Sequence, residues 1–150
     1  MKVTLLTGAS GGIGEALANR LAERKHNLVL VARNESKLKV LAEQLARQHQ
    51  VAVEYISADL SKADAIQKIF DETQKRRLEI EMLINNAGIG SGGEFATLLL
   101  QSELAMLQLN ISSLVALTHL FLQQMKARGF CHLANRHTKP FNNFVLWKNL

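Results

Sequence analysis

A glycine-rich segment near the N-terminus has the composition of an anion-binding turn. It lies between an apolar run and residues with helical spacing, and it reads Thr7-Gly8-Ala9-Ser10-Gly11-Gly12-Ile13-Gly14. Glycines let a chain turn sharply and bring backbone N–H groups close to a ligand, and the start of a helix attracts negative charge. The segment therefore predicts a cradle for a pyrophosphate. A tight turn without a ligand would use the same glycines and is the alternative.

The second apolar run ends in residues that distinguish between two dinucleotides. The run at 28–31 is followed by Ala32 and Arg33. At this place a fold that prefers NAD carries an acid for the ribose 2′-hydroxyl, whereas an arginine accommodates a 2′-phosphate. Since Ala32 brings no carboxylate and the planar guanidinium fits a phosphate, we expect NADP rather than NAD, with Ser10 donating one more hydrogen bond. A surface cation beside Glu35 is the simpler alternative for Arg33.

The elements that must position these residues alternate along the chain. Apolar runs predict strands at 3–7, 28–31, 51–56 and 81–84, and helical spacing predicts a helix after each of the first three. Asn34 is expected to cap the second helix, and Ser61 with Asp64 resembles a capping box for the third. Strands that are apolar throughout are typical of a parallel sheet with helices on both faces. The predicted fold class is α/β, a doubly wound, Rossmann-like sheet.

A long apolar helix is expected over 101–126. Its leucines and Phe121 lie on more than one side. Such a helix has to be buried on both faces, by the sheet on one and by a partner or a later part of the chain on the other. The helix is therefore the expected surface for a homo- or hetero-oligomer.

The composition indicates one ordinary soluble domain. The chain has 150 residues, one Cys and a mean hydropathy of +0.01. A domain of this size forms a core without disulfides or a structural metal, and no uninterrupted apolar run reaches the ~18 residues of a membrane span. The lone Cys131 agrees with a reducing compartment, and Met1 leads almost directly into a strand. We expect a cytoplasmic protein with no signal peptide and no membrane partner.

The excess positive charge is confined to the end of the chain. The net charge is 18 minus 13, or +5, and the residues after Met125 carry five of the basic residues and none of the acids. Cations spread over such a length are typical of a solvated surface, so nucleic acid is not an expected partner. Cys131, His132 and His137 have no second Cys or acid nearby, so no metal site is expected.

Several separate motifs, in the right order, resemble the short-chain dehydrogenase/reductase family over roughly 1–135. The glycine segment resembles its cofactor loop, Asp59-Leu60 its adenine-contacting pair, and Asn85-Asn86-Ala87-Gly88 its signature after the fourth strand. The resemblance implies hydride transfer between a nicotinamide and the carbonyl or alcohol carbon of a small molecule. With Ser10 and Arg33 from the argument above, the expected cofactor-binding residues are Thr7, Gly8, Ser10, Gly12, Ile13, Gly14, Arg33, Asp59, Leu60, Asn86, Ala87 and Gly88.

The resemblance implies a catalytic site of which this chain contains only part. Asn110 falls at the family's catalytic Asn, which positions a proton-relay water, and Thr138 takes the place of the Ser that polarises the carbonyl. The Tyr and Lys of the family's Tyr-x-x-x-Lys, in which the Lys lowers the Tyr pKa, are expected near or beyond Leu150. The single Tyr, Tyr55, is expected to pack within the third strand. A satisfied polar core group is the alternative for Asn110.

We therefore expect 1–135 to be an incomplete, C-terminally truncated NAD(P)-binding domain and 136–150 an aberrant basic and aromatic tail, as a frame change would produce. Catalysis by this chain is left open. A non-catalytic NADP-binding or interaction module, paired with a full-length relative through 101–126, is the alternative. A third interpretation is an unorthodox site that uses Asn110 and Thr138. The segment 144–147 is expected to protect the sheet edge if it adds a strand.

Overall fold

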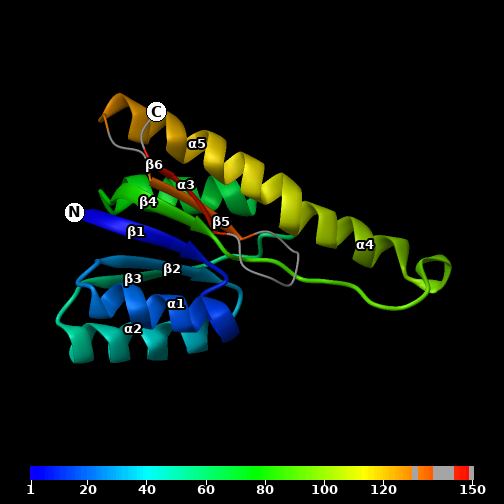
Figure 1. Cartoon of the computed structure of the whole chain (residues 1–150), viewed down its shortest axis with the longest axis horizontal. Helices are drawn as coiled ribbons and strands as arrows, with labels where there is room; N and C mark the ends of the chain where they lie inside the picture. The colour runs from blue at the N-terminus through cyan, green and yellow to red at the C-terminus, as the bar shows by residue number, and fades with distance from the viewer. Residues whose placement is uncertain (130–131, 137–143, 149–150) are drawn as a thin grey trace.

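Parallel strands form a sheet at the centre of the molecule, and helices cover both faces of this sheet (Figure 1). The computed structural model describes residues 1–129, 132–136 and 144–148. The first half of the chain contains β1 (Lys2–Thr7), α1 (Gly12–Glu23), β2 (Leu28–Ala32), α2 (Glu35–His49), β3 (Val53–Ser57) and α3 (Ala65–Lys75). The second half contains β4 (Glu79–Asn85), a 3₁₀ turn (Phe95–Thr97), α4 (Leu100–Leu107), a π-helical turn (Gln108–Ser112), α5 (Ser113–Ala127), β5 (His132–Arg136) and β6 (Phe144–Lys148).

The described strands form one six-stranded sheet in the order β3-β2-β1-β4-β5-β6. The pairs from β3 to β5 are parallel, and β6 runs antiparallel to β5. The predicted doubly wound, Rossmann-like α/β fold is confirmed. Because the strand order turns from β2 on one side of β1 to β4 on the other, a crevice is expected where the carboxyl ends of β1 and β4 meet.

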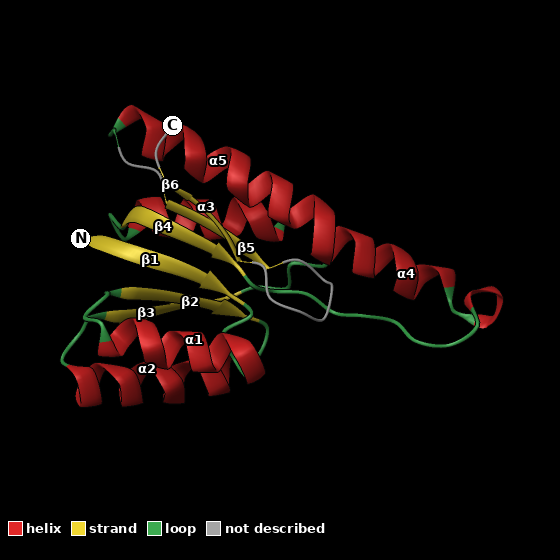
Figure 2. Ribbon diagram, in the orientation of Figure 1, coloured by secondary structure: helices red, strands yellow, loops and turns green. Residues whose placement is uncertain are grey.

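Alternate residues of the strands supply two separate apolar layers. Leu5 of β1 belongs to the layer under α3 and α5, whereas its neighbour Leu6 belongs to the layer under α1 and α2. The same alternation holds in β2 between Val29 and Leu30. Successive side chains of a strand point to opposite faces, so a strand covered on both sides is apolar at every position. Figure 2 shows the two helical layers on opposite sides of the strands.

The two helix starts predicted from the sequence differ in outcome. Asn34 caps α2, since its side-chain oxygen accepts the N–H of Lys37 at 2.9 Å. The capping box predicted for α3 is wrong: Asp64 has helical backbone angles and makes no capping hydrogen bond. Ser61 instead donates its hydroxyl and its N–H to Asp59 Oδ1, at 2.8 and 3.1 Å. The Ser hydroxyl is used one turn earlier, at the end of β3, and is not available to the helix.

The long helix predicted over 101–126 is present, but only one of its faces is covered. Phe121 and its neighbours Leu117 and Met125 are almost fully buried. The other face is solvent-exposed in this chain, and α4 extends beyond the end of the sheet (Figure 1). We call this face the exposed stripe; it consists of Leu100, Leu104, Leu107, Ile111 and Val115. Burial on both faces, as expected from the sequence, would therefore require a surface outside the described part of this chain.

The same helix bears on the expectation of no membrane partner. That expectation rested on uninterrupted apolar runs, whereas Leu100–Ala127 is 28 residues long and contains an 18-residue window with a mean hydropathy of 1.5. By length and composition alone this helix could cross a membrane, a criterion that core helices of soluble proteins also meet.

The end of the chain is described only in part. The segment 144–147 lies within β6, which covers the outer edge of β5, so the strand that the sequence analysis named as protection for this edge is present. Thr138, His137 and Cys131 lie outside the described residues, so the expectations placed on them stay predictions.

Candidate functional site

The carboxyl ends of β1 and β4 are joined through the hydroxyl of Thr7. This side chain is 1% exposed. Its oxygen accepts the N–H groups of Asn86 and Ala87, both at 3.0 Å, and donates to the carbonyl oxygen of Ile84 at 3.4 Å. Two N–H groups of the Asn85-Asn86-Ala87-Gly88 motif and the carbonyl oxygen just before it thus bond to one side chain of the glycine segment. Thr7 is a positioning residue for the crevice, since it does not line the cavities described below.

Asn86 completes the connection between the two loops. Its side-chain N–H₂ donates to the carbonyl oxygens of Thr7 and Gly8 at 3.0 and 3.3 Å. Because Asn86 is 4% exposed, these bonds are shielded from water and fix the path of the glycine segment. The sequence motif around Asn86 is therefore a clamp on the loop that follows β1.

Two glycines of the segment are required for different reasons. A Cβ on Gly14 would lie 2.0 Å from the carbonyl oxygen of Gly8, so only glycine lets the helix start pack against the turn. Gly12 has φ +56 and a Cβ there would meet no atom within 4 Å of it. A side chain at Gly12 would instead enter the space in front of the first N–H groups of α1, which have no partner within the helix.

Two cavities lie along this edge and share Gly8, Ala87 and Gly88. The first, of about 350 Å³, lies at the N-terminus of α1 and is lined by Gly8, Gly11, Gly12, Ile13, Gly14, Asn86, Ala87 and Gly88. The second, of about 130 Å³, extends toward β2 and β3 and is lined by Gly8, Ser10, Ala32, Arg33, Ala58, Asp59, Leu60, Ala87, Gly88, Ile89 and Leu109. Together they form a trough with backbone N–H groups at one end and an arginine at the other, which is the donor set that a dinucleotide requires.

The β2–β3 end of the trough carries the two charged residues predicted for adenosine. Arg33 is exposed and lines the cavity together with Asp59. Partial burial raises the pKa of Asp59, but the hydrogen bonds from Ser61 and the positive charge of Arg33 outweigh it and leave that pKa below its ordinary value. Asp59 is thus a carboxylate at neutral pH. Asp59 also begins a turn, because its carboxylate accepts the N–H and the hydroxyl of Ser61.

Asn110 lies in the π-helical turn between α4 and α5, where an extra residue is accommodated in the helix. Its side-chain oxygen accepts the N–H of Ile89 at 3.0 Å, and its N–H₂ donates to the Ile89 carbonyl oxygen at 2.7 Å. The side chain holds the loop after Gly88 against the helix and does not itself line the trough. This arrangement agrees with the alternative of a satisfied polar group, and a bond to the relay water is an untested prediction.

Tyr55 lies apart from the predicted site residues. It is in β3 and packs against the apolar layer under α1 and α2, as expected from the sequence. The motif Tyr-x-x-x-Lys does not occur within the 150 residues. Of the residues that the sequence analysis did not name, Ala58, Ile89 and Leu109 line the trough. Ala58 and Ile89 directly adjoin predicted motifs, which is the signal that would have found them.

A second polar side chain at this edge, that of Asn85, is buried and does not line the trough. Asn85, the last residue of β4, donates from its side chain to Thr118 of α5 and to Asn135 of β5 at 3.0 and 2.9 Å. Its own side-chain oxygen is buried without a hydrogen-bond partner in the described residues. These bonds connect β4 to α5 and to β5, so the first Asn of the motif has a structural role distinct from that of Asn86.

The comparisons with known proteins agree with this geometry. The family model described as "short chain dehydrogenase" matches residues 2–135. The "11-beta-hydroxysteroid dehydrogenase A" of Sesamum indicum is 44% identical over 90 residues, which are 60% of this chain and 26% of that protein. The "Very-long-chain 3-oxoacyl-CoA reductase-A" of Danio rerio is 36% identical over 132 residues, 85% of this chain and 41% of that protein.

The solved structures give the same result. A short-chain dehydrogenase from Sphingobium yanoikuyae, determined in complex with NADPH, superposes with a TM-score of 0.83 at 33% identity and covers 90% of this chain and 53% of that one. The chain belongs to the short-chain dehydrogenase family, a family of oxidoreductases. It spans only about a quarter to a half of the length of these three relatives.

Proposed function

We propose that this chain is the NADP(H)-binding part of a short-chain dehydrogenase/reductase, with residues 1–135 as the binding unit and 136–150 as an appended tail. The observation that carries the proposal is the trough, in which the N-terminus of α1 and Arg33 lie at opposite ends of connected cavities. A pyrophosphate would lie on the N–H groups of the helix start, and the guanidinium would face the 2′-phosphate. The NADPH complex of the Sphingobium relative supports this choice of cofactor.

The proposed reaction class is hydride transfer to or from the carbonyl or alcohol carbon of a small molecule. When bound, the nicotinamide would supply the hydride to a carbonyl carbon or accept it from an alcohol carbon. The names of the two curated relatives support this class, since one is a hydroxysteroid dehydrogenase and the other an oxoacyl reductase. In the chain itself, Asn110 fixes the loop at Ile89, on the wall of the trough. The proton donor that the family resemblance implies, a Tyr followed by a Lys, has no counterpart in the 150 residues.

NADPH titration of the purified chain, followed by nucleotide fluorescence, tests cofactor binding. Gly12→Val should abolish binding because its side chain enters the phosphate end of the trough without striking protein atoms. Gly129→Val is the matched control, since Gly129 also has positive φ, +75, and an open Cβ position, but lies at the end of α5. NADPH affinity equal in the wild type and Gly12→Val would overturn the proposed site. Absence of binding by the folded wild type would overturn the function.

The exposed stripe supports a second proposal, that the helix over 101–126 associates with a second copy of the chain. No Asp, Glu, Lys or Arg occurs between Glu103 and Lys126. A surface without charge does not repel a copy of itself, and it can form the symmetric contact that closes a dimer.

We further propose a soluble, cytoplasmic protein. Recovery of the chain in the membrane fraction after cell lysis would contradict both assignments.

A further inference from the structure

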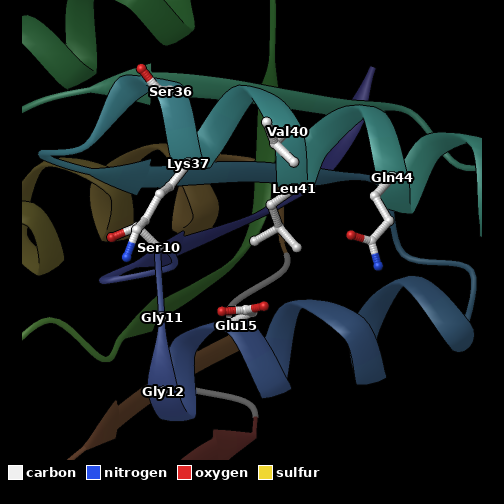
Figure 3. Close-up of a pocket in the computed structure, with 9 residues that line it drawn as sticks. All are labelled: Ser10, Gly11, Gly12, Glu15, Ser36, Lys37, Val40, Leu41 and Gln44. Carbon is white, nitrogen blue, oxygen red and sulfur yellow. The ribbon is translucent and has the colours of Figure 1, made fainter.

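A third cavity lies between α1 and α2, next to the trough, and has a volume of about 620 Å³. It shares Gly11 and Gly12 with the cavity at the N-terminus of α1 and Ser10 with the cavity beside Arg33. Figure 3 shows that its walls come from the glycine segment and α1 on one side and from α2 on the other. Its lining residues are Ser10, Gly11, Gly12, Glu15, Ser36, Lys37, Val40, Leu41 and Gln44. The residues on the α2 side of this cavity belong to none of the motifs that predict cofactor binding.

Ser10 connects this cavity to the adenosine end of the trough. It lines both cavities, whereas Arg33 lines only the trough and Lys37 only the cavity between the helices. A group bound beside Ser10 therefore lies at the boundary of the two cavities. Arg33 would approach it from the end of β2, and Lys37 would approach it from the first turn of α2.

The backbone of Lys37 is fixed at this boundary. Its N–H donates to the capping side chain of Asn34, and the next residue, Leu38, is fully buried. From this anchored position the Lys37 side chain extends across the mouth of the cavity toward Ser10 (Figure 3). No ion pair or hydrogen bond holds its ammonium group within residues 1–129, 132–136 and 144–148. An anion at Ser10 would therefore not have to displace an existing partner.

The charge at the other wall limits where an anion can bind. Glu15 lines the cavity from α1, and its carboxylate points toward α2 (Figure 3). A phosphate placed deep between the helices would meet this carboxylate, whereas a phosphate at the Ser10 boundary would have two cations nearby. The boundary is thus the favourable location for an anionic group in this cavity.

We propose that Lys37 is a specificity-determining residue that binds the 2′-phosphate of NADP(H) from the α2 side, opposite Arg33. This inference rests on the proposed function and adds a second cation to its adenosine end. An ammonium on a flexible stem acts as a point charge toward phosphate and complements the planar fork of an arginine. Removing the ammonium group of Lys37 should weaken the binding of nucleotides that carry the 2′-phosphate and leave the affinity for the others unchanged.

Binding of NADPH, NADH and 2′,5′-ADP to the full chain tests the proposal. Lys37→Met should lower the affinity for NADPH and 2′,5′-ADP about fivefold to tenfold, with NADH affinity unchanged. Lys39→Met is the matched control, because Lys39 is exposed on the same helix and lies outside the cavity lining. Lys37→Arg should keep most of the NADPH affinity. Circular dichroism should show the same folded state for all variants.

The outcomes separate this inference from the proposed function. If the wild type binds NADPH more tightly than NADH and Lys37→Met changes neither affinity by more than about twofold, the role of Lys37 is wrong and the proposed function stands. An equal loss for NADPH and NADH in Lys37→Met would also overturn it, since the effect would not involve the 2′-phosphate. If the folded wild type binds none of the three nucleotides, the proposed function itself fails.

Discussion

Two regions of the molecule differ in how completely this chain bonds or covers their side chains. One is the edge at the ends of β1 and β4, and the other is the helix formed by α4 and α5. At the edge, Thr7 and Asn86 join two loops by bonds that are shielded from water. Along the helix, Phe121 is fully buried while the exposed stripe, from Leu100 to Val115, has no cover within the described residues. The first region can reach its structure from the β-α units of this chain alone, whereas the second has apolar surface left for another molecule.

The largest effect is expected from the hydroxyl that holds the edge together. Thr7→Val leaves the Ala87 N–H without its acceptor, whereas the Asn86 N–H keeps its bond to the Ile84 carbonyl oxygen at 3.1 Å. This change should lower the free energy of unfolding by about 2 kcal/mol. Thr4→Val is the matched control on the same strand, since Thr4 is also fully buried. Its hydroxyl has one long contact, 3.5 Å to His26 Nδ1, and so should contribute less than that of Thr7. Urea unfolding measures both. An equal loss in the two variants would remove the distinction drawn for Thr7.

A smaller change in stability, but a change in assembly, is expected on the helix. Leu107 and Ile111 are 47% and 56% exposed, so Leu107→Lys with Ile111→Lys should alter the unfolding free energy by less than about 0.5 kcal/mol. The same pair of charges should convert a dimer into a monomer in analytical ultracentrifugation. Val40→Lys, at a 64% exposed site on α2, is the control and should leave the dimer intact. A monomeric wild type would contradict the proposed association.

The smallest expected effect is the pH dependence contributed by Asp59. Its pKa is lowered in the folded chain, so its ionised form stabilises the fold above the unfolded-state pKa of about 4, and this contribution is lost as the pH falls further. Asp59→Asn should therefore be slightly less stable than the wild type at pH 7. The two should converge when thermal unfolding is followed down to about pH 3. A constant difference over this range would assign the effect to packing and not to charge.

The fold could be predicted because its strands are apolar at every position. Leu28 to Val31 show the pattern plainly, since both faces of β2 are covered and no residue is free to be polar. The glycine segment was equally informative, because Gly14 has no space for a side chain. In each case the constraint acts on the residue type itself, and it is therefore visible in the sequence.

The parts that sequence reasoning missed depend on contacts between distant residues. Ser61 has the right type and spacing for a helix cap, but its hydroxyl is bound to Asp59, and no local pattern indicates which of the two partners it takes. Lys37 resembles any other surface lysine until the start of α2 is placed beside Ser10. The exposed stripe could not be separated from the buried face either, because leucine occurs on both.

The π-helical turn sets which side chains of α4 share a face with those of α5. One residue in excess of the regular helix lies between Gln108 and Ser112, and each residue rotates a helix by about 100°. Deleting a single residue there would turn α4 about its axis relative to α5. Leu104 and Leu107 would leave their line with Val115, and Asn110 would lose its alignment with Ile89. The anchoring of the loop and the continuity of the apolar surface are thus coupled through the length of one turn.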